Sequence, residues 1–397
     1  MRVALGNLGL DEGGALLIKR ALSQTPPGGQ ISVSGSAPDL ELHLRSWCRS
    51  EGHTLQWLGE GGSQALITVG STVAARWSGA ERAGSADPSA PHAVAEHAPR
   101  HWGLAARGAL VESGSPEFAF PLAHKTEVWS IDAGRLYAQG AAAQWDPATA
   151  IPWNAEFDLP PEVEDAVVQI MTYLIENETA ALLVPSRFAS QMHPHFREVM
   201  QALALQAADE ARHIVVFTRR ALLKRKELGL STSGGQASLK TLVEEPDFAI
   251  ASFLLSVLGE GTFLSLLWFL ERHAPDPVTA AVCRLAAQDE ARHVAFGIAH
   301  LREQIAQDPG VPPKLANAVR RRHGALQHTA GLNAEVFDAL LLIAAGGWEP
   351  EDLRRGHQNL MQLVREMDEL RQKRMLLLGF GEAEAQELSS LHTRNFM

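Results

Sequence analysis

One five-residue pattern occurs twice in this chain, as Asp209-Glu210-Ala211-Arg212-His213 and as Asp289-Glu290-Ala291-Arg292-His293, 80 positions apart. A glutamate and a histidine three positions apart lie on one face of a helix, so both can reach a single metal ion. Each copy falls on the apolar stripe of a long predicted helix, where an ionisable side chain is costly to bury unless it is neutralised. Two such copies favour a buried metal site over surface Glu–His pairs. A duplication that binds no metal is the remaining alternative.

A dinuclear site needs further carboxylates from the two other long helices. The third predicted helix offers Glu260, which bulky apolar residues such as Phe253 and Val257 flank on its own face. The alternative for Glu260 is a carboxylate at a helix kink or cap, because a glycine stands on either side of it. The first helix offers Glu176 and Glu178. At about 100° per residue, Glu178 falls on the apolar side and Glu176 on the polar side, so we expect Glu178 as the ligand and keep Glu176 as the fallback.

The predicted metal ligands share a place on core-facing stripes, and they are Glu178, Glu210, His213, Glu260, Glu290 and His293. A glutamate from each of two helices with a Glu-x-x-His from each of two others is the ligand arrangement of ferritin-like di-metal carboxylate proteins. Four carboxylates balance the charge of two divalent ions, and without metal some of them would have to be protonated to stay buried. Oxygen and nitrogen ligands suit iron or manganese, so we expect two iron ions or a manganese–iron pair.

The doubled Asp-Glu-x-Arg-His pattern resembles that of the bacterial multicomponent monooxygenase hydroxylases, over residues 160–306. The resemblance implies a ferritin-like di-iron fold and O2-dependent chemistry, and it does not indicate a substrate. It also implies that the aspartate of each motif orients the histidine of the other: Asp209 would support His293, Asp289 would support His213, and Arg212 and Arg292 would complete the network.

Three positions depart from related di-iron families. Phe217 stands where ribonucleotide reductase small subunits carry a radical tyrosine, and Ala286 where arylamine N-oxygenases carry an additional histidine. Leu264 stands where the multicomponent hydroxylases carry a threonine. We therefore expect no tyrosyl-radical storage at position 217 and a different route of proton delivery. His300, two turns beyond His293, is expected at the surface or at a helix end.

These features lead to the hypothesis of an O2-dependent di-iron oxidoreductase of the mono-oxygenase, N-oxygenase or desaturase type, acting on a small organic substrate. The alternative is a ferritin-like metal protein, non-catalytic or of the oxidase type, for iron or peroxide handling or sensing. A third hypothesis is a scaffold whose metal only stabilises the bundle. The sequence shows neither a Gly-rich dinucleotide loop nor a set of iron–sulfur cysteines, so electrons would come from an external ferredoxin or reductase.

Long amphipathic segments predict a mainly α protein with a four-helix bundle and a helical tail. Bundle helices are predicted over 161–184, 194–228, 247–273 and 276–306. Further helices are predicted over 125–145, 315–328, 333–345, 350–378 and 382–391. The predicted domains are an α/β domain at 1–76, a linker at 77–100 and a ferritin-like helical domain at 101–397.

The first 76 residues predict the order strand, helix, strand, helix, strand, strand. This order, with the sequence Leu44–His53, resembles the small TusA/SirA-type sulfur-carrier domains. Those domains hold sulfur on a cysteine in a Cys-Pro-x-Pro turn before the first helix, whereas Leu10–Gly14 contains no cysteine here. Cys48 lies in the second predicted helix and is expected to be a buried, unreactive thiol. We expect a domain that has kept the shape, lost sulfur transfer, and serves as a docking or cap module.

The chain carries 35 Lys and Arg against 46 Asp and Glu, a formal net charge of −11. This balance argues against binding to nucleic acid or to an anionic membrane. Only two cysteines are present, the N-terminus has no apolar signal core, and the apolar runs are too short and interrupted to span a bilayer, so a cytoplasmic location is expected. The basic run 219–226 is expected to be a solvated helix end rather than a contact for an acidic partner, and a homodimer is an open alternative.

Overall fold

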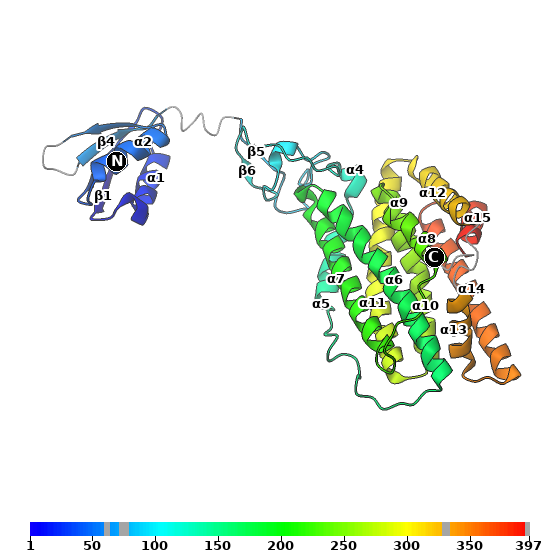
Figure 1. Cartoon of the computed structure of the whole chain (residues 1–397). Coiled ribbons are helices and arrows are strands. Elements are labelled where there is room, and N and C mark those ends of the chain that lie inside the picture. The colour runs from blue at the N-terminus through cyan, green and yellow to red at the C-terminus, as the bar shows by residue number, and fades with distance from the viewer. Residues whose placement is uncertain (59–63, 71–78, 328–333, 394–397) are drawn as a thin grey trace. The chain divides into compact units, whose positions relative to one another are not determined.

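The computed structural model describes residues 1–58, 64–70, 79–327 and 334–393, and the chain divides into two compact units (Figure 1). One unit comprises Met1–Ala93 and Arg100–Phe118, and the other comprises Val94–Pro99 and Ala119–Met397. The first unit holds the described β-sheets and the second holds the long helices. The fold is therefore mainly α, with a small α/β domain at the N-terminus, as the sequence predicts.

The α/β domain has the predicted element order. Its elements are β1 (Arg2–Gly6), α1 (Ala15–Ser23), β2 (Gln30–Gly35), α2 (Leu40–Ser50), β3 (Thr54–Trp57) and β4 (Gln64–Thr68). The sheet order is β1-β2-β4-β3, with β1 parallel to β2 and the other neighbours antiparallel. Alternate strand residues such as Ile31 and Val33 are buried in one core with Ile18 and Leu44 of the helices.

The segment where sulfur carriers hold their cysteine is a helical turn in this chain, η1 (Leu10–Gly14). The remaining thiol of the domain, Cys48 on α2, is buried, and burial raises its pKa to about 11. At neutral pH this thiol is therefore almost entirely protonated, which agrees with the expected unreactive cysteine.

A small lobe follows the α/β domain in the first unit. Its elements are β5 (Glu81–Arg82), η2 (Arg100–Trp102) and β6 (Leu110–Val111), and β5 pairs antiparallel with β6. The indole of Trp102 donates to Glu81 Oε1 at 2.6 Å. The predicted linker 77–100 is thus structured in its described part, from Gly79 on. Its small residues, which are typical of linkers, instead bury methyl groups such as that of Ala83.

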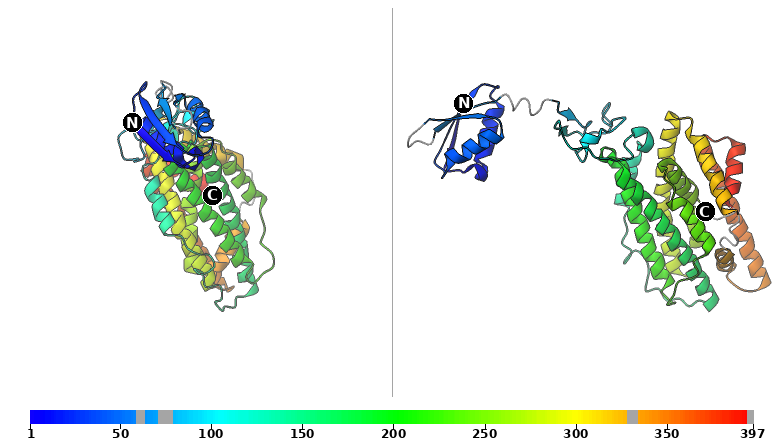
Figure 2. Two further views of the ribbon diagram at one scale, coloured as in Figure 1. Left: turned by 90° about the vertical axis from the view of Figure 1, so that its left-hand side faces the viewer. Right: turned by 45° about the horizontal axis from the view of Figure 1, so that its top comes forward.

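Four long helical segments form a bundle in the second unit, and Figures 1 and 2 show them running alongside one another. They are α6 (Pro161–Gln191), α7 (Arg197–Ala221), the composite segment Phe248–His273 and α11 (Pro277–Gln307). Prolines occupy the first position of α6 and α11, where no N–H is needed, and the Asp276 side chain caps α11 by accepting from the Thr279 N–H. The predicted apolar stripes of α7 and α11 are buried.

The third bundle segment is not one regular helix. It consists of α9 (Phe248–Ser252), the π-helical η4 (Phe253–Glu260) and α10 (Gly261–His273). Asp247 fixes its start, because its side chain accepts from the Ile250 N–H at 3.0 Å. The sequence predicts a single helix over 247–273. It does not indicate the π-helical turn, because such a turn leaves the apolar composition of the segment unchanged.

Shorter and later helices complete the second unit. They are α4 (Lys125–Val128), α5 (Ala133–Ala142), η3 (Pro194–Phe196), α8 (Ser233–Val243), α12 (Val311–Leu326), α13 (Ala334–Ala345), α14 (Pro350–Leu377) and α15 (Glu382–Thr393). The predicted helix 125–145 is interrupted at Trp129, whose backbone is extended. The sequence did not predict α8, whose first turn contains two glycines of low helix propensity. The predicted helix ends at 328 and 333 lie outside the described residues.

Two bundle segments are long and apolar enough to cross a membrane by length and composition, namely α6 and Phe248–His273. This differs from the expectation that no apolar run is long enough. However, 67% of the most apolar window of α6 and 89% of that of Phe248–His273 are buried within the protein. Core helices of a bundle have this composition.

Candidate metal centre

The six predicted ligand side chains converge inside the bundle. α6 contributes Glu178, η4 contributes Glu260, α7 contributes Glu210 and His213, and α11 contributes Glu290 and His293. None of the six is more than 4% exposed. Helix packing, rather than a loop, positions each of them.

The ligand atoms form two overlapping groups, and within each group they all lie within 4.8 Å of one another. The first donor set is Glu178, Glu210, His213 and Glu290, and the second donor set is Glu210, Glu260, Glu290 and His293. Glu210 and Glu290 belong to both sets, which is the arrangement of two metal positions bridged by two carboxylates. The cluster can therefore hold two metal ions.

Each histidine presents its Nδ1 atom to the carboxylates. His213 Nδ1 lies 3.1 Å from Glu210 Oε2 and 3.5 Å from Glu290 Oε1. His293 Nδ1 lies 3.0 Å from Glu210 Oε1 and 3.3 Å from Glu290 Oε2. The two Nδ1 atoms are therefore the nitrogen donors of the two sets.

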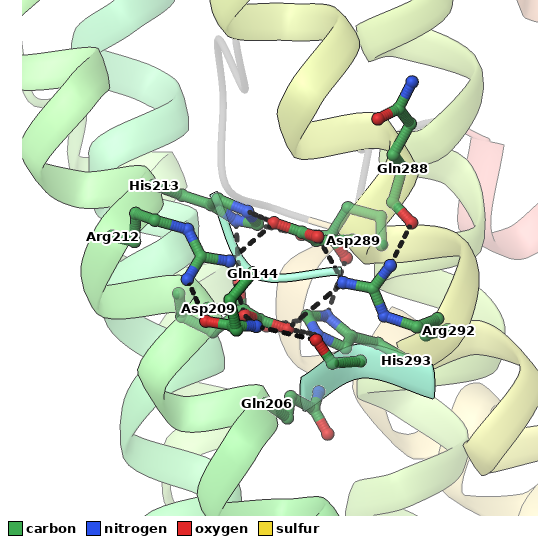
Figure 3. Close-up of polar contacts among 12 residues, drawn as sticks. Gln144, Gln206, Asp209, Arg212, His213, Gln288, Asp289, Arg292 and His293 are labelled. Atoms are coloured by element: carbon green, nitrogen blue, oxygen red, sulfur yellow. Dashed lines mark hydrogen bonds and ion pairs between the residues drawn. The ribbon is translucent and has the colours of Figure 1, made fainter. Parts of the chain in front are cut away.

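The Nε2 atoms face the aspartates in a crossed arrangement, which Figure 3 shows. His213 Nε2 lies 3.2 Å from Asp289 Oδ2, and His293 Nε2 lies 3.2 Å from Asp209 Oδ2. Arg212 donates to Asp209 at 2.5 Å and to Asp289 at 2.8 Å. Arg292 donates to Asp289 and lies 3.6 Å from Asp209. The structure thus brings together the residues that the family resemblance predicts as support for the histidines.

Burial dominates the electrostatics of the cluster. Burial and the neighbouring carboxylates raise the pKa of Glu178 and the pKa of Glu260 well above the ordinary range of glutamate. Burial alone would lower the histidine pKa values, but the surrounding carboxylates raise the pKa of His213 and of His293 well above the usual range. In the metal-free state the site therefore holds protons where two divalent ions would otherwise supply positive charge.

The donor set fits a dinuclear metal centre. Four buried glutamates without a metal would repel one another, and two of their oxygens, Glu178 Oε1 and Glu260 Oε2, have no hydrogen-bond partner among the described residues. A buried carboxylate oxygen without a partner is costly, so a cation at this place would stabilise it. Mixed oxygen and nitrogen donors match iron and manganese.

Three contacting residues were missed by sequence reasoning. Gln144 donates to Asp209 at 2.8 Å, and the Trp145 indole donates to Asp289 at 2.7 Å. Gln206 donates to Glu260 at 2.5 Å. Gln144 and Trp145 lie in the irregular segment after α5, where no periodicity could have indicated them, whereas Gln206 lies one turn before Glu210 on α7 and the helical phase could have.

Glu176 and His300 both lie outside the two donor sets. Glu176, the fallback ligand, is only half-buried and belongs to neither donor set. His300 was expected at the surface or at a helix end, and this was wrong, because its side chain is fully buried beside Phe248 and Phe296. Burial lowers the pKa of His300 to about 4, so the ring is neutral at physiological pH. Its Nδ1 contacts the Trp129 carbonyl at 3.3 Å.

A void of about 20 Å³ adjoins the histidine side of the second donor set. Gln206, Asp209, His293 and Phe296 are among the side chains that line it. This volume has room for about one water-sized molecule.

Comparisons with known proteins found only structural neighbours of low similarity. No family model and no curated protein matches the chain. A single-residue mutant of an R2-like ligand-binding oxidase with an aerobically reconstituted Mn/Fe cofactor shares 17% identity, over 66% of this chain and 94% of that chain, with a TM-score of 0.44. The R2-like ligand-binding oxidase from Sulfolobus acidocaldarius shares 16% identity, over 59% of this chain and 89% of that chain, with a TM-score of 0.39. The functional argument therefore depends on the residues of the site.

Proposed function

We propose that this chain is an O2-dependent oxidoreductase with a dinuclear iron or manganese–iron centre, and that it oxidises a small organic substrate by hydroxylation, N-oxygenation or desaturation. The observation that carries the proposal is the pair of overlapping donor sets that share Glu210 and Glu290. Glu210 and Glu290 would hold two ions close enough together to serve one small molecule jointly. A site that only stabilised the bundle would not need two redox-capable positions.

When bound, the metal ions would supply electrons for the reduction of O2. The chain's own residues set the conditions for this chemistry. Glu210 and Glu290 hold the two positions close together, while Glu178 and Glu260 complete the first and the second donor set. Asp289 and Asp209 accept hydrogen bonds from the Nε2–H groups of the histidines, which keeps each Nδ1 atom directed at the carboxylates.

The histidines, with the neighbouring donors, favour the ionised form of both aspartates: His293 and Gln144 lower the pKa of Asp209 against the opposing effect of burial. Burial opposes ionisation of Asp289, but the hydrogen bonds and charge of His213, together with the donors Arg212 and Trp145, lower the pKa of this carboxyl. An ionised Asp289 accepts a hydrogen bond and cannot donate one, so it holds a proton on His213 Nε2.

Electrons for repeated turnover would come from an external ferredoxin or reductase, which we propose as the protein partner. The described cysteines are two separate buried thiols, Cys48 and Cys283, and they form no cluster that could carry electrons. The basic run 219–226 does not favour a partner there as a whole, because Arg220 is fully buried between Glu164 and Asp276.

An oxidase that reduces O2 or peroxide without an organic substrate is the second candidate function. The small size of the space beside the second donor set favours it, since about 20 Å³ has room for one water-sized molecule. The organic-substrate proposal requires more space beside the centre than this.

Metal analysis and oxygen uptake test these proposals. Protein purified from iron- and manganese-replete medium should hold two ions per chain, and its reduced form should consume O2. Uptake that rises with added small amines, acids or hydrocarbons supports the organic-substrate proposal, whereas uptake that no organic compound changes supports the oxidase. A chain with two ions and no O2 uptake contradicts both and leaves the metal as a structural element.

A further inference from the structure

Two buried arginines of α14, Arg371 and Arg374, lie against the metal-binding third segment of the bundle. Arg371 is 1% exposed and Arg374 is 8% exposed. Within the described part of the chain, Arg374 forms no ion pair with a carboxylate, and its Nη2 atom has no hydrogen-bond partner. Burial and the neighbouring Arg371 lower the pKa of Arg374 to about 9. Burying a guanidinium in this way costs free energy, so its remaining contacts must offset the cost.

Arg374 and Arg371 both donate to groups at the end of the π-helical segment or just after it, and Arg371 Nε also donates to Ser389 Oγ at 3.1 Å. Arg374 Nε donates to the Val257 carbonyl at 2.7 Å. Arg371 Nη1 donates to Thr262 Oγ1 at 2.8 Å, and that hydroxyl donates to the Leu258 carbonyl at 2.6 Å. The two arginines therefore bind two successive carbonyls of η4. Arg374 donates to the Val257 carbonyl directly, and Arg371 is linked to the Leu258 carbonyl through the Thr262 hydroxyl.

Gly261 makes the close approach of Arg374 possible. A Cβ atom added at Gly261 would lie 2.5 Å from Arg374 Cζ, a distance that would force the guanidinium away. Gly261 directly follows Glu260, the ligand that the third segment contributes. Phe380, which follows α14, stacks on Phe253 at the other end of η4 with a centroid distance of 6.0 Å. The tail thus contacts η4 at both ends.

A π-helical turn needs such support. Its wider winding shifts the backbone hydrogen-bond pattern and leaves carbonyl groups that the helix does not pair in the usual way. A buried carbonyl requires a donor: the Val257 carbonyl accepts from Arg374, and the Leu258 carbonyl accepts from Thr262 as well as from the Gly261 N–H. Without these donors a regular α-helical turn becomes more favourable, and the change of winding rotates Glu260 about the helix axis.

We propose that Arg374 is a positioning residue of the metal centre, which holds the π-helical turn so that Glu260 faces the second donor set. The proposal rests on the proposed dinuclear function. It makes the C-terminal tail a part of the metal centre, although the described residues of the tail contribute no member of either donor set. It also has a selective consequence: loss of Arg374 weakens the second donor set, to which Glu260 belongs, and leaves the first donor set intact.

Binding of Mn(II) to the metal-free full chain tests the proposal. The variants are Arg374→Gln, which removes the charge and the fork of donors, Arg374→Lys, which keeps a donor for the Val257 carbonyl, and Gly261→Ala, which displaces the guanidinium from the other side. Arg365→Gln is the matched control, because Arg365 is an exposed arginine of the same helix. Each variant is titrated anaerobically, and thermal unfolding of the metal-free form is recorded alongside.

Arg374→Gln and Gly261→Ala should each weaken one of the two Mn(II) affinities by about 10- to 100-fold and leave the other unchanged, and Arg374→Lys should restore part of the loss. Arg365→Gln should bind both ions as the unaltered chain does. Equal weakening of both ions, in step with a lower unfolding temperature of the metal-free form, would show that Arg374 only packs and would overturn the proposal.

A double-mutant cycle identifies the affected position. Glu260→Gln removes a ligand of the second donor set only, and Glu178→Gln one of the first only. Arg374→Gln should not weaken Mn(II) binding further when Glu260→Gln is already present. It should have its full effect when combined with Glu178→Gln. Additivity with Glu260→Gln contradicts the inference. An unaltered chain that binds fewer than two ions overturns the proposed function and this inference with it, whereas two ions bound unchanged in Arg374→Gln overturn this inference alone.

Discussion

Each histidine of the proposed metal centre divides its two ring nitrogens between the carboxylates and an aspartate of the opposite motif. The crossed pairs, His213 with Asp289 and His293 with Asp209, both measure 3.2 Å. Because each aspartate belongs to the helix that carries the other histidine, the pairs also tie α7 to α11. The repeated motif therefore works as a pair, and neither copy would be complete alone.

Glu210 and Glu290 belong to both donor sets, so metal binding should depend on them most strongly. Glu210→Ala removes a member of both donor sets, so the metal content should fall from two ions per chain to fewer than one. Glu176→Ala is the control, since Glu176 is half-buried and outside both sets, and it should retain both ions. Metal analysis after anaerobic loading provides the measurement. Two ions retained in Glu210→Ala, or lost in Glu176→Ala, would contradict the assignment.

Metal binding should depend on pH with a definite sign. The pKa values of Glu178 and Glu260 are raised well above the ordinary value, as are those of His213 and His293, so these groups hold protons in the metal-free state. Metal must displace these protons, and the apparent affinity therefore falls as the pH falls. Adding Mn(II) to weakly buffered protein should release protons. An affinity that does not change between neutral and mildly acidic pH would contradict this account.

The convergence of the six side chains could be predicted from the sequence because each of them sits on a helix. A spacing of three positions fixes the Glu–His pairs, and the helical phase separates Glu178 from Glu176. Trp145 and Arg374 could not be predicted, because their contacts span 144 and 117 positions and neither lies on a stripe that points to the site. The π-helical winding of η4 has no signature in hydrophobic periodicity.

A second buried cluster ties three bundle helices together away from the metal ligands. Arg220 of α7 donates to Glu164 of α6 at 2.6 Å and to Asp276, the cap of α11, at 2.8 Å. All three side chains are at most 5% exposed. The pKa of Arg220 is raised by these carboxylates despite the opposing effect of burial.

Arg220→Met should therefore lower the free energy of unfolding by about 3–5 kcal/mol, since it leaves two buried carboxylates without a counter-charge. Urea unfolding of the metal-loaded protein measures the effect. Arg219→Met is the control at the neighbouring exposed position, where the side chain lies over the Trp153 ring, and it should cost about 1 kcal/mol or less. Equal losses in the two variants would show that the buried cluster contributes no more than a surface contact.

The helices themselves show where sequence reasoning succeeds and where it stops. Long stripes of apolar residues predict α6, α7 and α11 to within a few residues at most ends. The helix α8 was not predicted, because its first turn, Ser233-Gly234-Gly235, contains two glycines of low helix propensity. In the structure the Thr232 side chain caps this turn. The part of 77–100 that the structure describes was predicted as a linker from composition, which does not reveal that small side chains can also pack closely.

Two compact units with separate cores should respond differently to metal removal. The α/β domain has its own buried cluster around Ile18, Ile31 and Leu44, and it contains no member of either donor set. Chelation should therefore lower the unfolding temperature of the helical unit and leave a second transition, that of the α/β domain, unchanged. Differential scanning calorimetry with and without chelator provides the measurement. A single transition that moves as a whole would contradict independent units.

Anomalous diffraction from metal-loaded crystals, recorded at the iron and manganese edges, tests the central claim most directly. The account predicts two peaks inside the bundle, both within bonding distance of Glu210 and Glu290, one beside His213 and the other beside His293. A single peak, or none among these side chains in protein loaded to saturation, would contradict the dinuclear centre and every functional proposal built on it.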